Sequence, residues 1–259
     1  MGSKKIKDLI KDATMGVSSA EFELGRCCFL GQDVEKDYNR AFYWFNKAVN
    51  DNNADAKYYL ALCFKNGLGC DRNINRALNL FEDAANDGNI LAQYNLGTIY
   101  YLGLIGKVDY YKAFIWFEKA ANAGLVEAQY NTAICYADGT GVKKDLNKAF
   151  YWYQETCKKK YPMGQYSLGR CYEFGLGIPQ FDEMAFFWYL KSAEANYNEA
   201  MYSLALCYHK GYGCIKDENK AGFWLNKAAG LNHKLASNEL KHYKKNFLGK
   251  YRRIDNDEW

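Results

Sequence analysis

Apolar residues recur along this chain in two short helical patterns that alternate over almost its whole length. In the stretch 92–127, Ala92, Leu96 and Tyr100 are spaced four residues apart, so they lie on one face of a helix. A glycine-containing segment, 103–109, leads into a second apolar helical face, which is formed by Ala113, Trp116, Phe117, Ala120 and Ala121. The pattern predicts a helix–turn–helix unit whose apolar faces become buried only when several units stack.

This unit recurs every 36 residues without an insertion. The small residue that opens the first helix is repeated as Ala20, Ala56, Ala92, Ala128, Gly164, Ala200 and Ala236. Eleven residues after the first six of these stands a turn glycine, at Gly31, Gly67, Gly103, Gly139, Gly175 and Gly211. The second helix carries an alanine that is followed three residues later by Trp44, Leu80, Trp116, Trp152, Trp188 and Trp224. We therefore predict an all-α solenoid of six 36-residue helix–turn–helix repeats over residues 20–235.

Degenerate copies of the unit are predicted at both ends of the array. Residues 1–19 carry lysines and aspartates around a short apolar pattern, so we expect an N-terminal capping helix with a polar outer face. Residues 236–246 resemble a seventh first helix, in which Lys241 stands where the repeats have glycine or alanine. A lysine there would keep another helix away, so this helix is expected to cap the C-terminal end. The tail, 247–259, is either a frayed end or a short segment that docks to a partner.

Composition and charge narrow the range of partners. The chain has 34 basic and 30 acidic residues, and a net charge of +4 is too small to favour general electrostatic capture of nucleic acid. The basic residues near the C-terminus are concentrated at Lys234, Lys241, Lys244, Lys245, Lys250, Arg252 and Arg253. No stretch approaches about 18 consecutive apolar residues, so we expect no membrane span, and the N-terminus lacks the apolar segment of a secretory signal.

The residues that usually carry chemistry form no recognisable constellation in the sequence. The nine cysteines occupy repeat positions held elsewhere by small or apolar residues, which predicts reduced core thiols in an intracellular protein. His209, His233 and His242 lack the spacing of a metal site or a catalytic triad. The glycine turns lack the Gly-Lys-Ser/Thr ending of a phosphate-binding loop, and they follow a helix where such a loop follows a strand. We therefore expect no cofactor, no metal and no enzymatic activity.

The combined pattern AxYxLGxxYxxGxG, followed by Ala, by Trp-Tyr or Trp-Phe and by Ala-Ala-x-x-Gly, resembles the Sel-1-like repeat family, a relative of the tetratricopeptide repeats. The resemblance extends over about residues 20–246, with departures at Thr132, Gly164 and Leu80. It implies a right-handed α-solenoid whose first helices line a concave groove. It also implies an adaptor or scaffold that binds other proteins. Some secreted, cysteine-rich members pair cysteines between successive repeats, and that pairing pattern is absent from this sequence.

Helical geometry assigns residues to the groove that the resemblance implies. The core stripe of a first helix consists of its opening small residue (position 0), the residue at +4 and the residue at +8. Positions +2, +6 and +9 then point toward the groove, with +3 beside them. Asparagine amides there suit a peptide backbone and arginines suit carboxylates, while packing between repeats is the competing interpretation of the tyrosines at +2. The candidate binding residues are Arg26, Tyr58, Tyr94, Asn95, Thr98, Tyr101, Tyr130, Asn131, Tyr166, Arg170 and Tyr202.

Three functions are compatible with this sequence. The first is a cytoplasmic, monomeric adaptor or scaffold that binds a protein or peptide segment in the groove. The Asn-, Lys- and Tyr-rich composition is typical of an AT-rich genome, such as that of an intracellular bacterium or a large virus, so delivery into a host cell is a further expectation for its location. The second function is a weak hydrolase activity. The third is binding of nucleic acid or of an anionic membrane surface through the basic C-terminal segment.

Overall fold

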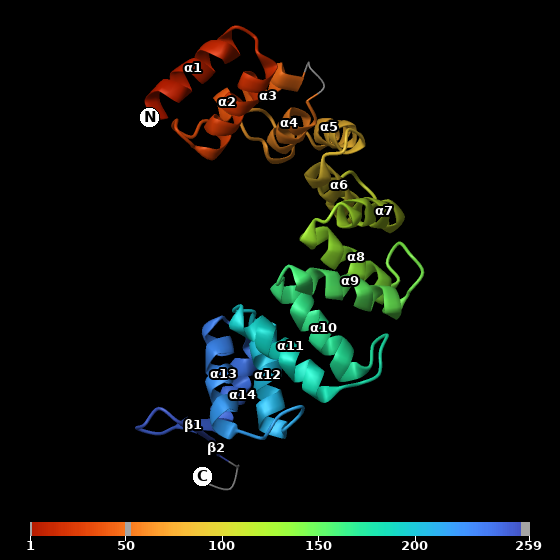
Figure 1. Ribbon diagram of the computed structural model, residues 1–259, viewed down its shortest axis with the longest axis vertical. Coiled ribbons are helices and arrows are strands. Elements are labelled where there is room, and N and C mark those ends of the chain that lie inside the picture. Colours follow the sequence, from red (N-terminus) through yellow and green to blue (C-terminus); the bar gives the residue numbers. More distant parts are fainter. Residues whose placement is uncertain (1, 50–52, 255–259) are drawn as a thin grey trace. The chain divides into compact units, whose positions relative to one another are not determined.

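The computed structural model describes residues 2–49 and 53–254. Within these residues the chain forms 14 α-helices, a 3₁₀ turn and a two-stranded hairpin, so the predicted all-α repeat fold is confirmed (Figure 1). The helices are α1 (Gly2–Thr14), α2 (Ser18–Leu30), α3 (Tyr38–Ala48), α4 (Ala54–Asn66), α5 (Ile74–Asn86), α6 (Ile90–Leu102), α7 (Tyr110–Asn122), α8 (Val126–Asp138), α9 (Leu146–Lys158), α10 (Pro162–Phe174), α11 (Asp182–Glu194), α12 (Asn198–Lys210), α13 (Glu218–Gly230) and α14 (Lys234–Glu239). The 3₁₀ turn η2 (Leu240–His242) and the strands β1 (Tyr243–Lys245) and β2 (Tyr251–Arg253) follow them.

The chain divides into two compact units, unit 1 (Met1–Ala128) and unit 2 (Gln129–Trp259), and each is described by itself. In both units the two helices of a repeat pack against each other, as α4 does on α5 and α10 on α11 (Figure 1). The second helix of one repeat then packs against the first helix of the next, as α5 does on α6 and α11 on α12. Each apolar face is thereby buried between neighbours, which a single helix pair could not achieve.

Polar N-caps and glycine C-caps set the ends of these helices. Most second helices begin after a residue whose side chain accepts a hydrogen bond from the backbone N–H three positions on, namely Asp37, Asn73, Asp109, Asp145 and Asp217. Helix α11 is different, because Phe181 precedes it and offers no such acceptor. Several first helices end at a glycine in the left-handed conformation, namely Gly31, Gly67, Gly103, Gly175 and Gly211. The local stop signals therefore repeat with the same period as the core.

The core of each unit combines small and large apolar residues from both helices of a repeat. Phe45 and Phe81 of unit 1 and Tyr189 of unit 2 are fully buried. A glycine in the first helix allows the close approach that buries such a ring. A Cβ at Gly97, for example, would lie 2.5 Å from ring carbons of Phe117, which is far inside van der Waals contact.

The C-terminal end differs from the capping helix that the sequence predicts over residues 236–246. Helix α14 ends at Glu239, and β1 pairs antiparallel with β2, with Tyr243 opposite Arg253. The hairpin packs on α13, where Gly222 leaves room for it, since a Cβ at Gly222 would lie 2.4 Å from the Cβ of Tyr251. In this extended conformation Tyr243 is buried, with 8% of its surface exposed. Residues 255–259 of the predicted tail lie outside the described residues.

Two departures from the repeat pattern compensate each other between α9 and α10. Thr156 and Gly164 stand where another repeat has the alanine pair Ala84 and Ala92. Thr156 is fully buried, and its hydroxyl donates a hydrogen bond of 2.7 Å to the carbonyl oxygen of Tyr153. A Cβ at Gly164 would lie 1.7 Å from Thr156 Oγ1, so the hydroxyl of the threonine occupies the space that a methyl group takes elsewhere.

We expect Gly164→Ala to lower the free energy of unfolding by about 1–3 kcal/mol, because the added methyl group overpacks the contact with Thr156. The double variant Thr156→Ala/Gly164→Ala restores the alanine pair of the other repeats and should recover much of the loss. Chemical denaturation followed by circular dichroism measures both variants. Gly230→Ala is the control for helix propensity, since nothing lies within 4 Å of its added Cβ. A double variant no more stable than Gly164→Ala would contradict the compensation.

Candidate functional site

A pocket-like region recurs in successive repeats of unit 2. It lies between the C-terminal end of the first helix and the start of the second helix of a repeat. Three positions define it: the +9 residue of the first helix, the first residue of the second helix, and the +7 position of the following unit. We call this region a slot and number it by its repeat. The slots of unit 2 are slot 4 (Ala137, Leu146, Cys171), slot 5 (Glu173, Asp182, Cys207) and slot 6 (His209, Glu218, Tyr243).

Slot 5 is an open pocket of about 420 Å³ with an acidic lining. The hydroxyl of Tyr189 donates a hydrogen bond to the carboxylate of Glu173 near the end of α10. Gln180 Nε2 donates to Asp182 Oδ1, at the start of α11, over 3.1 Å. Burial, reinforced by the neighbouring Glu173, raises the pKa of Tyr189, so its hydroxyl remains protonated. None of the described residues that line this pocket is a lysine, an arginine or a histidine.

Slot 4 is a smaller pocket of about 230 Å³ with mixed charge. Ala137 and Leu146 stand where slot 5 has its two carboxylates. Its lining instead includes the charged side chains of Asp138, Lys144 and Arg170. Two adjacent repeats thus present pockets at corresponding positions, and the chemistry of the two pockets differs.

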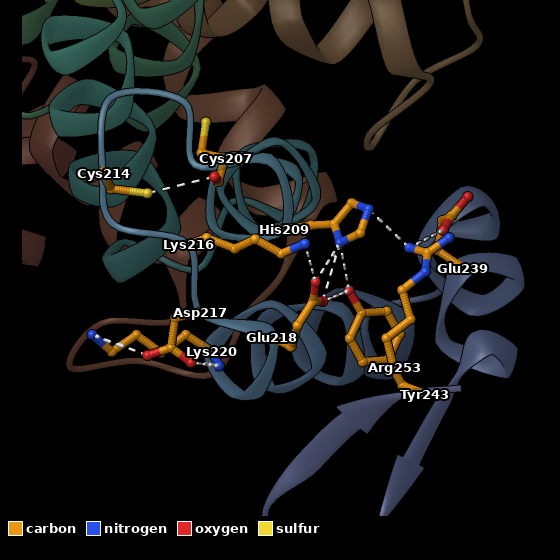
Figure 2. Close-up of polar contacts among 10 residues, drawn as sticks. All are labelled: Cys207, His209, Cys214, Lys216, Asp217, Glu218, Lys220, Glu239, Tyr243 and Arg253. Atoms are coloured by element: carbon orange, nitrogen blue, oxygen red, sulfur yellow. Dashed lines mark hydrogen bonds and ion pairs between the residues drawn. The ribbon is translucent and has the colours of Figure 1, made fainter. Parts of the chain in front are cut away.

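Slot 6 is filled by the C-terminal hairpin (Figure 2). Tyr243 of β1 stands where slots 4 and 5 have a cysteine, and its hydroxyl donates to Glu218 Oε2 over 2.7 Å. His209 Nδ1 lies 3.0 Å from the same carboxylate, and Lys216 Nζ lies 3.0 Å from Oε1. Arg253 of β2 directs its guanidinium to His209 Nε2 over 3.1 Å. Figure 2 shows these side chains converging from α12, α13 and the hairpin, so the chain places its own residues in slot 6.

The contacts in slot 6 fix the tautomer of its histidine and the charge of its carboxylate. A guanidinium has only donors, so His209 Nε2 accepts from Arg253 and the N–H at Nδ1 donates to Glu218. Burial alone would raise the pKa of Glu218. Hydrogen bonds from Tyr243, His209 and Lys216 outweigh burial and hold the pKa of this carboxyl below its ordinary value of 4.5. The cluster is therefore a satisfied network that joins the hairpin to α12 and α13.

The candidate tyrosines at +2 pack between helices, in agreement with the competing interpretation of these residues. The ring of Tyr166 lies against Tyr189 and Tyr197, with centroids 5.6 and 5.4 Å away. Tyr202 stacks on His233 at 4.7 Å. The other candidates at +2 have similar neighbours, Tyr58 beside Phe81, Tyr94 beside Phe117 and Tyr130 beside Tyr153. Binding of a ligand by the remaining exposed edges of these rings stays a prediction.

Among the candidate residues of unit 2, Arg170 lies at a pocket. Its side chain is exposed and lines slot 4, and its guanidinium lies 5.6 Å from the ring centroid of Phe174. Asn131 is partly buried in α8.

The candidate residues of unit 1 are engaged by neighbours within that unit. Asn95 Oδ1 accepts a hydrogen bond of 2.8 Å from Lys65 Nζ, and burial lowers the pKa of this lysine. The other contacts are those of Thr98 Oγ1 with the carbonyl of Tyr94, of Arg26 with Glu23 and of Tyr101 with the ring of Tyr110. These residues are therefore less available to a ligand than helical geometry alone suggests.

Most of the slot residues are not among the groove positions that helical geometry predicts on the first helices. Glu173 and His209 belong to the +9 row, but Asp182 and Glu218 open second helices, which the groove geometry does not select. The signal in the sequence is a change of charge at corresponding positions, from Ala137 in one repeat to Glu173 in the next.

The cysteines of the described residues are free thiols, and most of them are buried. Burial raises the pKa of Cys135 to about 11 and that of Cys207 to about 12, so these thiols are protonated at neutral pH. No group of three or more His, Cys, Asp or Glu side chains within residues 2–49 and 53–254 is arranged to hold a metal ion. In the same part of the chain, no helix combines the length and the apolar character that a membrane crossing requires.

We expect Tyr243→Phe to raise the pKa of Glu218 toward its ordinary value, because the variant loses a hydrogen bond that stabilises the carboxylate. NMR shifts of the glutamate carboxyl carbons, followed against pH, measure this pKa. Tyr251→Phe on the facing strand is the control and should leave it unchanged.

Because the folded-state pKa of Glu218 lies below the unfolded-state value, the cluster stabilises the fold above that ordinary value. The stabilisation is lost as the pH falls through the folded-state pKa. Tyr243→Phe should therefore lose less stability on acidification than the wild type. The network would be contradicted by an unchanged Glu218 pKa in this variant.

Comparisons with known proteins identify the repeat. A sequence profile described as Sel1 repeat matches six consecutive segments, residues 18–53, 54–89, 90–125, 126–161, 162–197 and 198–233. The structure is similar to that of a protective antigen present in uropathogenic Escherichia coli strains, which displays an SLR fold. The TM-score is 0.86 and the identity is 30%, over 90% of this chain and 50% of that one. A Sel1 repeat protein from Oxalobacter formigenes is also similar, with a TM-score of 0.74 and 32% identity over 83% of this chain and 88% of that one. No curated protein matches the sequence.

The matched segments are contiguous from residue 18 to residue 233, and each begins two residues before the small residue from which the sequence pattern counts a unit. The chain spans half the length of the Escherichia coli protein. Six matched repeats and two similar repeat structures lead to one conclusion: the chain belongs to the Sel1-repeat family.

Proposed function

We propose that this chain is a non-catalytic scaffold that binds a segment of another protein across slots 4 and 5 of unit 2. Sel1-repeat proteins are generally protein-interaction scaffolds. The proposal is carried by one observation, the pair of open pockets of about 230 and 420 Å³ at corresponding positions of adjacent repeats. A segment that lies across α10 can place one side chain in each pocket, which is how anchor residues give an interface its affinity.

The state of slots 1, 2 and 6 supports this choice of surface. At the slot 1 position of unit 1, Phe29 packs edge-on against Tyr38, with ring centroids 5.3 Å apart. At the slot 2 position, Lys65 is bound to Asn95. Slot 6 is filled by the hairpin. Arg170 remains a candidate from the sequence, because it is exposed and lines one of the open pockets.

Selection of random displayed peptides on the full chain should enrich a ligand, whose affinity fluorescence anisotropy then measures. We expect Arg170→Ala to weaken binding by about tenfold, because it removes a charge-assisted contact from slot 4. Arg26→Ala is the matched control. Arg26 occupies the same repeat position, but it is paired with Glu23 on its own helix, so its removal should have little effect. The proposal would be contradicted if no peptide were enriched, or if both variants lost the same affinity.

A second candidate function is attachment to an anionic membrane surface through the tip of the hairpin. Phe247 and Leu248 stand at this turn with 95% and 67% of their surface exposed. Asn246 Oδ1 accepts hydrogen bonds from the backbone N–H groups of Leu248 and Lys250, at 3.0 and 2.9 Å, so the turn is fixed locally. Lys245 and Lys250 flank the two apolar side chains and are exposed. Apolar side chains framed by lysines suit the interface of an anionic bilayer.

Co-sedimentation with phosphatidylserine-containing vesicles tests this second function. We expect Phe247→Ser/Leu248→Ser to lose most of the bound fraction, because the two side chains supply the apolar area that enters the interface. Phe223→Ser, which changes an exposed phenylalanine of α13, is the control and should bind as the wild type does. Equal binding to vesicles of phosphatidylcholine alone, or unchanged binding by the double variant, would exclude the hairpin as the membrane contact.

A further inference from the structure

We propose that slot 5 binds an arginine side chain of the partner segment. This inference rests on the proposed function and specifies the chemistry of its ligand. The pocket of about 420 Å³ is lined by two carboxylates from successive helices, Glu173 of α10 and Asp182 of α11. None of the described lining residues carries a positive charge that would neutralise them. A pocket of this kind favours a cation.

Slot 6 shows how a guanidinium enters this place in a repeat (Figure 2). There Arg253 donates to His209 Nε2 over 3.1 Å and forms an ion pair of 3.8 Å with Glu239. Its guanidinium lies 5.8 Å from the ring centroid of Tyr243. In slot 5 the position of His209 is taken by Glu173, so a neutral acceptor is replaced by an anionic one, which forms stronger hydrogen bonds with a guanidinium.

Slot 5 also lacks the large side chain that occupies slot 6. The position of Tyr243 is taken in slot 5 by Cys207, whose side chain is far smaller. Slot 5 has no strand that corresponds to β2, which supplies Arg253 to slot 6. The chain that follows α12 forms a turn instead, and Tyr212 of this turn lines slot 5. The place that the chain fills with its own arginine and tyrosine in slot 6 is therefore an open pocket one repeat earlier.

Two aromatic side chains at the pocket favour arginine over lysine. Phe174 and Tyr212 line slot 5 and are 57% and 49% exposed. Both rings already attract cations of the chain, since Arg170 lies 5.6 Å from the centroid of Phe174 and Lys210 lies 5.5 Å from that of Tyr212. Neither of these two cations lines the pocket. A planar guanidinium can stack on a ring and bond a carboxylate in its own plane, which an ammonium group cannot do.

A metal ion suits slot 5 less well than a guanidinium does. Glu173 already accepts from Tyr189, and Asp182 accepts from Gln180. No group of three or more His, Cys, Asp or Glu side chains in the described part of the chain is arranged as ligands. The donors of a guanidinium can share acceptors that are hydrogen-bonded in this way, because each carboxylate has lone pairs to spare.

The test is an NMR titration of the isotope-labelled full chain with N-acetyl-arginine amide, beside N-acetyl-citrulline amide as its neutral isostere. We expect saturable shifts of the backbone amides of Glu173, Phe174 and Asp182, with millimolar affinity for the arginine compound. The citrulline compound should bind at least about tenfold more weakly, because it lacks the charge. Glu173→Gln/Asp182→Asn should show the same loss for arginine, since these substitutions remove both charges and keep hydrogen-bond acceptors. Asp138→Asn in slot 4 is the matched control and should leave the arginine affinity unchanged.

The outcomes separate this inference from the function on which it rests. Absence of saturable shifts, equal affinity for the two compounds, or the same loss in Asp138→Asn would overturn slot 5 as an arginine site. The peptides enriched by display then decide about the scaffold. Enriched peptides that lack arginine and bind Glu173→Gln/Asp182→Asn as tightly as the wild type would leave the proposed function in place and remove this inference alone.

Discussion

The close contact between a small residue of each first helix and a large side chain of its second helix constrains the rest of the structure. A Cβ at Gly169 would lie 2.7 Å from ring carbons of Tyr189, so the ring occupies the space that a side chain at this position of α10 would need. The contact buries the ring of Tyr189 completely, while its hydroxyl reaches Glu173 in slot 5. The same packing that closes the core therefore also orients one of the carboxylates of the candidate site.

A fixed packing geometry with variable side chains explains why successive slots differ in chemistry. The +9 position changes from Ala137 to Glu173 and then to His209 along unit 2, while the helices around it keep the same spacing. A substitution at this position changes the charge of the slot. It leaves unchanged the small residues that allow the helices to pack closely. Each repeat can therefore present its own side chains on a shared backbone, which is the property that suits solenoid repeats to recognition of extended segments.

The 36-residue period of the sequence predicts the helices of the repeats. It does not predict features that depend on contacts between residues far apart in the chain. The position of Leu96 holds leucine in five of the six units, and the position of Gly97 holds glycine or alanine in all six, so the helices and their close contacts follow from the pattern. The hairpin does not follow, because residues 240–246 are compatible with a helix and the burial of Tyr243 depends on Glu218, which lies 25 residues earlier. The presence of Asp182 in slot 5 is not predictable from the sequence pattern for a similar reason. Only the packing of α11 on α10 places the start of α11 beside Glu173 at the end of α10.

The segment from α14 to β2 corresponds to an incomplete seventh repeat. It retains residues of the repeat pattern at the positions that contact the sixth repeat. Tyr243 continues the period of Cys171 and Cys207, although its backbone is extended rather than helical. The hairpin covers α13 at Gly222, where an added Cβ would lie 2.4 Å from the Cβ of Tyr251 and 3.0 Å from a ring carbon of Tyr243. In the repeat before it, α12 supplies this cover and contributes Cys207 to slot 5. Slot 6 is occupied because the hairpin that caps the array places Tyr243 and Arg253 in it. Slot 5 is open because the helix that packs at the same position, α12, has the small side chain of Cys207 there. The open slot is a consequence of this stacking, and it is the place where we propose that a segment of another protein binds.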